Sequence, residues 1–269
     1  MKIGCCTNMF ATEKDTIGMG GIETLKRIGY DYVELPIAPI IDLPKNDFNK
    51  LKGVLDACGM RCEVFNLLFP AEIRLTGDKV NRSVISDHLK KVVDIAEQLD
   101  TKVIIYGSGP ARNVPEGFSK DKAWQQLVEI LQEFDEMADS YGITLAVEPY
   151  NKKESNIINS TLDGLKLAKD SHGKNAKIVI DYFHSALEKE DADVVLTANE
   201  YVSHIHISRP EGRRFVKETD NENYLPFLNN LKKIGYDSRI SVEAFTDDLK
   251  IDAIQSLAFL RKVFFKNMV

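Results

Sequence analysis

The sequence contains few cysteines and no dense cluster of basic residues. The four cysteines among 269 residues, at positions 5, 6, 58 and 62, include no Cys-x-x-Cys pair. They are too few to stabilise a chain of this length through disulfide bonds, so we expect reduced, partly buried thiols. No basic run exceeds two residues, and 35 Lys and Arg against 41 Asp and Glu give a net charge of −6. The chain thus lacks the positive surface that nucleic acids require, and we expect no nucleic acid partner.

Long hydrophobic segments are also absent. No stretch approaches the roughly 18 apolar residues that a membrane-spanning helix needs. The short apolar start of the chain is interrupted at Thr7 and Asn8. We therefore expect neither a secretory signal nor a membrane partner, and a cytoplasmic location. With 43% hydrophobic residues, the chain has enough apolar side chains for one large core.

Short apolar segments alternate with longer amphipathic segments along the whole chain. Short apolar runs rich in Val and Ile are typical of buried parallel strands. The predicted strands are residues 2–8, 32–35, 61–66, 102–106, 144–148, 177–181, 202–208 and 240–244. Apolar residues at three- and four-residue spacing predict helices over 17–28, 47–58, 80–99, 122–141, 161–172, 190–199, 224–234 and 248–266. His88 and His172 fall within or at the end of helical segments, and we expect both on the solvated surface.

These segments form eight strand–helix units of about 34 residues each. No Ser/Gly-rich linker or low-complexity segment interrupts the series. Eight consecutive parallel strands close naturally into a barrel, so we predict an α/β fold with a single (β/α)8 TIM barrel domain over residues 1–269. A doubly wound open sheet is the alternative. However, the Gly-x-Gly-x-x-Gly sequence that a dinucleotide site needs does not follow the first strand.

Four residues at the ends of the last four predicted strands could bind a metal: Glu148, Asp181, His206 and Glu243. The intervals between them are 33, 25 and 37 residues, each about one strand–helix unit. Active residues of a barrel project from the carboxyl ends of its strands, so the four groups should converge at one rim. His204 lies two residues before His206 and points to the same side of the barrel, but deeper. We therefore expect a structural role for His204.

Three carboxylates and one imidazole form an oxygen-rich set of ligands. Such a set suits Mn²⁺, Mg²⁺ or Co²⁺, while zinc is less favoured because the set contains no cysteine and the carboxylates outnumber histidine. Three carboxylates crowded together without a cation would repel one another, at a cost in stability. A bound divalent metal is the simplest explanation of the set.

Four motifs at these strand ends carry a family resemblance: VEPYN at 147–151, IDYFH at 180–184, HIH at 204–206 and VE at 242–243. They closely resemble the xylose-isomerase-like TIM-barrel superfamily, specifically the sugar isomerase and epimerase group that contains the ketose (tagatose/allulose) 3-epimerases. The resemblance covers the whole chain in length and element order. It implies a metal-dependent sugar isomerase or epimerase with one divalent metal ion, Mn²⁺ being expected over Mg²⁺, Co²⁺ or Zn²⁺. It also implies a small-molecule sugar substrate and a homo-oligomer, either a dimer or a tetramer.

The resemblance further implies residue roles. Glu148, Asp181, His206 and Glu243 would bind the metal. Glu148 and Glu243 would also be the catalytic acid/base pair, moving a proton through a metal-stabilised cis-enediolate. Return of the proton to the opposite face gives epimerisation, and return to the neighbouring carbon gives aldose–ketose isomerisation. The residue set does not choose between these two reactions.

Five residues are candidates for substrate binding. The resemblance matches His184 to a substrate-binding histidine. Arg213 lies one residue beyond the position where the 3-epimerases usually carry arginine. Arg112 lies in the loop 107–113, whose glycines allow close backbone approach, and could neutralise an anionic group on a sugar. An ion-paired surface loop is the alternative for Arg112. Glu34 and Asn66 end the second and third predicted strands and are expected to line the pocket.

Three other functions remain as alternatives. A keto-polyol dehydratase or other lyase would use the same metal and base, because proton abstraction beside a carbonyl also begins β-elimination. An apurinic endonuclease would resemble this chain in its barrel fold. It would need extra histidines at the ends of strands two to four, where this chain has Glu34, Asn66 and Tyr106. A non-catalytic sugar-binding protein would hold no stoichiometric metal.

Overall fold

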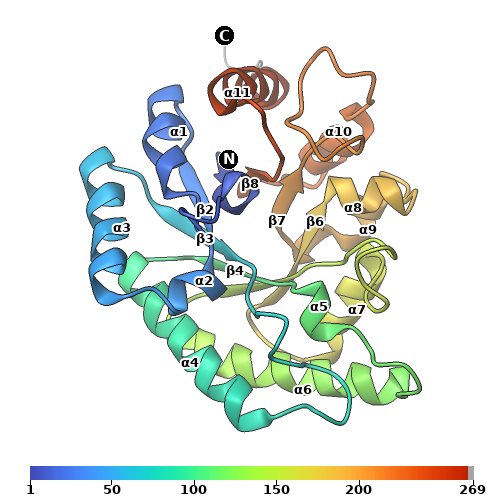
Figure 1. Cartoon of the computed structure of the whole chain (residues 1–269). Helices are drawn as coiled ribbons and strands as arrows, with labels where there is room; N and C mark the ends of the chain where they lie inside the picture. The colour runs from blue at the N-terminus through green and yellow to red at the C-terminus, as the bar shows by residue number, and fades with distance from the viewer. Residues whose placement is uncertain (266–269) are drawn as a thin grey trace.

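Eight parallel strands close into a barrel in the computed structural model, which describes residues 1–265 (Figure 1). Each strand pairs with the next along the chain, and β8 pairs with β1. The strands are β1 (Lys2–Cys6), β2 (Tyr32–Pro36), β3 (Cys62–Asn66), β4 (Val103–Tyr106), β5 (Thr144–Val147), β6 (Ala176–Asp181), β7 (Val202–Ile207) and β8 (Arg239–Val242). All eight begin and end within two residues of the predicted segments. The predicted (β/α)8 barrel is therefore confirmed.

Helices surround the barrel on its outside (Figure 1). Each of the eight predicted helical segments overlaps an α-helix: α1 (Ile22–Ile28), α3 (Lys45–Cys58), α4 (Arg82–Leu99), α6 (Lys120–Asp139), α7 (Thr161–Asp170), α9 (Val194–Ala198), α10 (Leu225–Lys233) and α11 (Leu249–Phe265). Residue 266, where the predicted last helix ends, and the remainder of the predicted domain to 269 lie outside the described residues.

Several short helices were not predicted. They are η1 (Thr7–Phe10), η2 (Met19–Gly21), α2 (Ile37–Ile41), α5 (Gly109–Arg112), α8 (Tyr182–Leu187) and η3 (Asn199–Tyr201). Segments of three to six residues are too short for a helical hydrophobic period to show in the sequence. Four of them, η1, α2, α5 and α8, follow β1, β2, β4 and β6, so they surround the carboxyl ends of the strands. His184, the predicted substrate-binding histidine, lies in the first half of α8.

Alternation along the strands separates the barrel interior from the layer beneath the helices. Tyr32, Val64, Val103, Ile105, Ala146 and Val179 form a small buried cluster of their own, apart from the large core. The ring of Tyr32 is accommodated by Gly4 in the neighbouring strand, where a Cβ atom would lie 2.3 Å from the ring. Since side chains two residues apart share a side of a strand, Glu34 follows Tyr32 on the same side, toward the carboxyl end.

The amino ends of three strands are joined by a partly buried ion cluster. The carboxylate of Glu63 in β3 binds Nζ of Lys2 in β1, and its other oxygen accepts a hydrogen bond of 2.7 Å from Nε of Arg239 in β8. Burial opposes the charge of Glu63, but the hydrogen bonds from Lys2 and Arg239 outweigh it and lower the pKa of the carboxyl. This end of the barrel therefore has a structural ion cluster, whereas the candidate site lies at the opposite end.

The prediction that His88 lies on the solvated surface is wrong. Its side chain is buried, its Nε2 lies 2.7 Å from the carbonyl oxygen of Leu68, and its ring stacks on Phe69. The loop after β3 folds back over α4 and covers the imidazole. His172 is exposed, as predicted. Across residues 1–265, the helices are all too short or too polar to cross a membrane.

Candidate metal centre and substrate pocket

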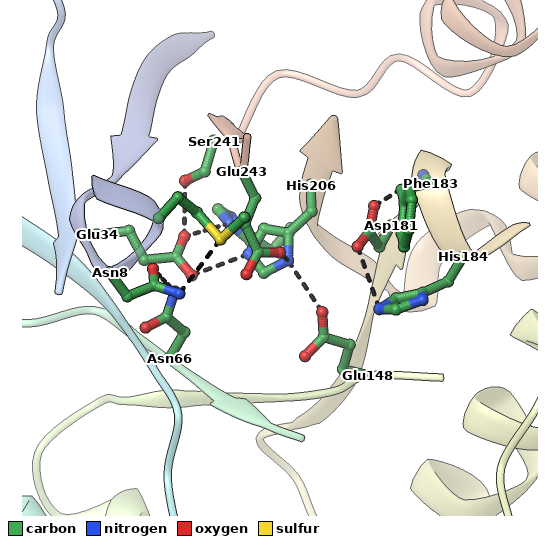
Figure 2. Close-up of polar contacts among 12 residues, drawn as sticks. Asn8, Glu34, Asn66, Glu148, Asp181, Phe183, His184, His206, Ser241 and Glu243 are labelled. Atoms are coloured by element: carbon green, nitrogen blue, oxygen red, sulfur yellow. Dashed lines mark hydrogen bonds and ion pairs between the residues drawn. The ribbon is translucent and has the colours of Figure 1, made fainter. Parts of the chain in front are cut away.

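The four predicted metal ligands meet at the carboxyl end of the barrel (Figure 2). Glu148 directly follows β5, Asp181 ends β6, His206 lies in β7 and Glu243 directly follows β8. One ligand atom from each residue lies within 4.8 Å of those of the other three, and all four side chains are buried. Asp181 and His206 are direct partners in the β6–β7 register, so the sheet itself holds them side by side.

His206 occupies the centre of this arrangement. Its Nδ1 lies 3.0 Å from Oε1 of Glu148 and 3.0 Å from Oε2 of Glu243. On the far side of the ring, Nε2 lies 2.9 Å from Oε1 of Glu34. Burial lowers the basicity of the imidazole, but the carboxylates of Glu34 and Glu243 outweigh it and raise the pKa of His206 well above its ordinary value.

Arg213 pairs with two of the predicted ligands. Its guanidinium donates to Oδ2 of Asp181 at 3.1 Å and to Oε2 of Glu243 at 2.8 Å, and it lies over the ring of Phe183. Burial opposes ionisation of Glu243, but Arg213 and His206 outweigh it and lower the pKa of Glu243 to about 2. Arg213, predicted from the sequence to contact the substrate, thus lies at the rim of the site and pairs with two of the predicted ligand carboxylates.

The donor set fits a divalent cation. Four carboxylates, Glu34, Glu148, Asp181 and Glu243, are buried within one network. Among residues 1–265, Arg213 is the only lysine or arginine that pairs with any of them. Buried charges of one sign require compensation, because desolvation and mutual repulsion otherwise destabilise them. Clustered oxygen ligands with an excess of negative charge are what Mn²⁺ and Mg²⁺ prefer in proteins.

His184 presents a hydrogen-bond donor to the site. The backbone N–H of Asn151 donates to its Nδ1 at 3.3 Å, and the side-chain amide of Asn151 donates to the same atom at 2.8 Å. The orientation of that amide is set by the backbone N–H of Lys153, which donates to Oδ1 of Asn151 at 3.0 Å. Nδ1 of His184 is therefore an acceptor, so the proton of the neutral ring is assigned to Nε2. Nε2 is buried without a hydrogen-bond partner among the described residues, 3.4 Å from Oδ2 of Asp181.

Glu154 is a site residue that the sequence reasoning missed. It lies in the loop after β5, its Oε1 accepts a 2.8 Å hydrogen bond from Asn151, and its Oε2 lies 4.0 Å from Arg213. Glu154 lies beyond the strand end, six residues after Glu148 in the same loop. A carboxylate in the same loop as a predicted ligand was the available signal.

Glu34 in β2 and Asn66 in β3 differ in what surrounds their side chains. Asn66 lies at the end of β3, where its Nδ2 donates to Oδ1 of Asn8 at 3.0 Å, and its own Oδ1 is buried without a partner in the described part of the chain (Figure 2). Glu34 has no exposed surface and lies behind His206. Glu34 is expected from the sequence to line the substrate pocket, and in the structure both of its oxygens are bonded to protein groups.

Arg112, which the sequence suggests as a contact for an anionic sugar, lies at the end of α5. Its side chain has no exposed surface and lies over the ring of Tyr150, with its Cζ 4.6 Å from the ring centroid. Its three guanidinium nitrogens have no hydrogen-bond partner within residues 1–265. The glycines of the same loop do allow close approach, but to protein groups: a Cβ at Gly107 would lie 2.6 Å from Oε2 of Glu148, and one at Gly109 would lie 2.7 Å from Tyr150.

Comparison with known proteins agrees with this geometry. The family model described as Xylose isomerase-like TIM barrel matches residues 22–263. The D-psicose 3-epimerase of Ruminiclostridium cellulolyticum is 25% identical over 236 residues, covering 83% of this chain and 77% of that protein. The ketose 3-epimerase of Arthrobacter globiformis is 24% identical over 257 residues, covering 93% and 85%.

A solved structure shows the same fold. The D-allulose 3-epimerase from Methylomonas sp., in complex with D-allulose, superposes with a TM-score of 0.85 at 22% identity, covering 98% of this chain and 97% of the other. The family match spans most of the sequence and contains all four predicted ligands. The chain therefore belongs to the xylose isomerase-like TIM barrel family.

Proposed function

We propose that this protein is a divalent-metal-dependent sugar epimerase that acts on the carbon beside the carbonyl of a ketose. The observation that carries the proposal is the convergence of Glu148 and Glu243 on one buried position, each 3.0 Å from Nδ1 of His206. They follow β5 and β8, which are separated by two strands of the barrel. Two carboxylates that approach one centre from different strands supply a base and an acid, which epimerisation requires.

Glu148, Asp181, His206 and Glu243 would hold the metal, for which Mn²⁺ is our choice over Mg²⁺, Co²⁺ and Zn²⁺. When bound, the metal would polarise the carbonyl and the adjacent hydroxyl of the sugar and so make the neighbouring C–H more acidic.

The protein's own residues move the proton and position the sugar. One of the two glutamates takes the proton from that carbon, and the other returns a proton to the opposite face. Arg213 keeps Glu243 ionised and therefore able to accept a proton. Nε2–H of His184 and the free Oδ1 of Asn66 supply a donor and an acceptor for hydroxyl groups of the substrate.

The substrate we propose is an uncharged ketose. The sequence offers two arginines near this rim that would suit an anionic sugar, but neither is free to bind one. Arg112 is buried against the ring of Tyr150, and the guanidinium of Arg213 binds Asp181 and Glu243. Several relatives support this choice, since they are named as D-psicose, L-ribulose and ketose 3-epimerases.

The test is isotope exchange at carbon 3. The Mn²⁺-loaded protein is incubated in D₂O with D-psicose, D-fructose, D-tagatose and L-ribulose, and the sugars are analysed by NMR and mass spectrometry. We expect deuterium at carbon 3 together with the epimer, and no epimer with Glu148→Gln or Glu243→Gln. Loss of water from a sugar would indicate the dehydratase instead. Absence of exchange with every ketose would contradict the proposal.

A further inference from the structure

A fully buried polar cluster lies behind His206 and takes no part in the proposed proton transfer. It consists of Glu34, His204, Ser241 and Tyr32, each with no exposed surface (Figure 2 shows Glu34 and Ser241). We propose that Glu34 is a positioning residue, which fixes His206 with the proton on Nε2 and the lone pair of Nδ1 directed at the metal. This inference rests on the metal site of the proposed function but not on its sugar chemistry.

Both oxygens of Glu34 accept hydrogen bonds. Oε1 lies 2.9 Å from Nε2 of His206. Oε2 lies 3.0 Å from Nε2 of His204 and accepts a 2.6 Å bond from the hydroxyl of Ser241. Since the cluster has no exposed surface, bulk solvent does not compete for these bonds. The carboxylate is therefore held at both ends by groups from β7 and β8.

The direction of these bonds follows from the number of protons available. Ser241 has one hydroxyl proton and uses it toward Glu34, so in the 2.8 Å contact between Tyr32 and Ser241 the tyrosine donates. An ionised carboxylate only accepts hydrogen bonds, so Nε2 of His206 must carry a proton. Nδ1 faces the carboxylates of Glu148 and Glu243 and can carry a proton for the same reason while no cation lies among them. A cation bound there would replace the proton on Nδ1, whereas the proton on Nε2 would stay with Glu34.

Packing holds this cluster in one arrangement. The ring of Tyr32 packs against Gly4, and any larger residue at position 4 would collide with the ring. His204 and His206 meet edge to face, with ring centroids 5.0 Å apart and planes at 90°. Two residues apart on β7, they share a side of the strand, opposite Glu34 of β2. A carboxylate that orients a ligand histidine through its second nitrogen strengthens metal binding, typically by 10- to 100-fold.

Glutamine is the informative replacement at position 34. Its side chain has the same shape, but its amide offers both an acceptor and a donor. The amide of the Glu34→Gln variant could donate to Nε2 of His206 and so select the tautomer with the proton on Nδ1, which cannot bind a metal through that nitrogen. We expect Glu34→Gln to weaken Mn²⁺ binding by about 10- to 100-fold. Ser241→Ala is the matched control, because it removes one bond to Glu34 and keeps the contact between Glu34 and His206.

The test is a titration of the metal-stripped full-length chain with Mn²⁺, followed by calorimetry or by the electron paramagnetic resonance of the free ion. Circular dichroism and thermal unfolding verify that each variant is folded. The proposal predicts a large loss of affinity in Glu34→Gln and a much smaller one in Ser241→Ala. Wild-type affinity in folded Glu34→Gln would overturn it.

A measurement on the wild-type chain covers the case in which the variant does not fold. In ¹⁵N NMR spectra of the Zn²⁺-loaded protein, we expect the imidazole of His206 to carry its proton on Nε2 and to bind metal through Nδ1. The opposite assignment would overturn the role of Glu34 while leaving the metal site intact. Failure of the wild-type chain to bind any divalent ion would overturn both this inference and the metal site on which it rests.

Discussion

The backbone N–H of Asn151 lies 3.3 Å from Nδ1 of His184, and the side-chain amide of the same asparagine lies 2.8 Å from that atom. Two donors from one residue thus fix which nitrogen of the imidazole carries the proton. His184 faces the site with Nε2–H as a donor, so its predicted role in substrate binding depends on a residue that does not itself need to touch the sugar.

Replacement of Asn151 should therefore affect turnover through His184. In Asn151→Ala the backbone N–H remains, and we expect kcat/KM to fall about tenfold, as for the loss of one buried hydrogen bond. Asn151→Asp should fall further, because a carboxylate favours a proton on Nδ1. Steady-state epimerisation kinetics measure both, with Lys152→Ala as the control, since that side chain is exposed in the same loop. Equal kinetics of the Ala and Asp variants would contradict the tautomer assignment.

Gly107 should be required for the position of Glu148. A Cβ atom there would lie 2.6 Å from Oε2 of Glu148 and 2.8 Å from the hydroxyl of Tyr150. Gly107→Ala must displace the carboxylate, and a shift of about 1 Å at a reacting group can cost about 100-fold in rate. Gly53→Ala is the matched control.

At Gly53 in α3, no atom lies within 4 Å of the added methyl group. The control should leave activity unchanged and raise the free energy of unfolding by up to about 1 kcal/mol, as expected for Gly→Ala in a helix. Wild-type activity in Gly107→Ala would show that Glu148 does not need this position.

The buried side chain of Arg112 should lower the free energy of unfolding of the protein. Its guanidinium is buried over Tyr150 without a hydrogen-bond partner among residues 1–265, and an unpaired buried charge loses its hydration without compensation. We expect Arg112→Met, which fills a similar volume, to raise the free energy of unfolding by about 1 kcal/mol or more. Arg112→Lys, which keeps the charge but loses the planar stacking, should lower it. Urea denaturation distinguishes the two, and a less stable Arg112→Met variant would refute this reading.

Glu63 should give the barrel a defined sensitivity to acid. Lys2 and Arg239 lower the pKa of Glu63 in the folded state below its ordinary value of 4.5. A carboxyl with a depressed pKa stabilises the fold above its unfolded pKa, and this stabilisation is lost as the pH falls through the folded pKa. The free energy of unfolding should therefore decrease below about pH 4.5 more steeply in the wild-type chain than in Glu63→Gln.

Urea denaturation between pH 6 and pH 3 measures this difference. Glu116→Gln serves as the control, because Glu116 is exposed and forms no ion pair with the described residues. A wild-type curve parallel to that of Glu63→Gln would show that the ion cluster contributes nothing to the acid response.

The strand order and the four ligand positions could be predicted because both depend on short-range signals. Buried parallel strands leave apolar runs in the sequence, and the barrel places each strand end at the same rim, so the intervals from Glu148 to Glu243 mark neighbouring positions. The short helices after the strands could not be found in the same way. They contain less than two helical turns, so α8, which carries His184, leaves no helical period in the sequence.

The roles of Glu34 and Arg112 depend on how deeply each side chain is buried in the fold. This burial cannot be predicted from the neighbouring residues in the sequence. Glu34 ends up behind His206 because β2 turns it into the barrel toward β7 and β8, more than 160 residues away in the sequence. Arg112 is buried because α5 places it against Tyr150 of the next strand's loop. Both charged residues are at the strand ends where substrate contacts were expected, but long-range packing decides which of them reach the pocket.

The measurement that tests the account most directly is metal binding to the purified, metal-stripped chain. Titration with Mn²⁺ should show one tight site per chain in the wild type, and that site should be lost in Asp181→Asn, which removes a ligand charge but keeps its shape. Deuterium exchange at carbon 3 of a ketose should rise in proportion to the occupied site. Exchange that is unaffected by removal of the metal, or binding of three zinc ions per chain in place of one ion, would contradict the account.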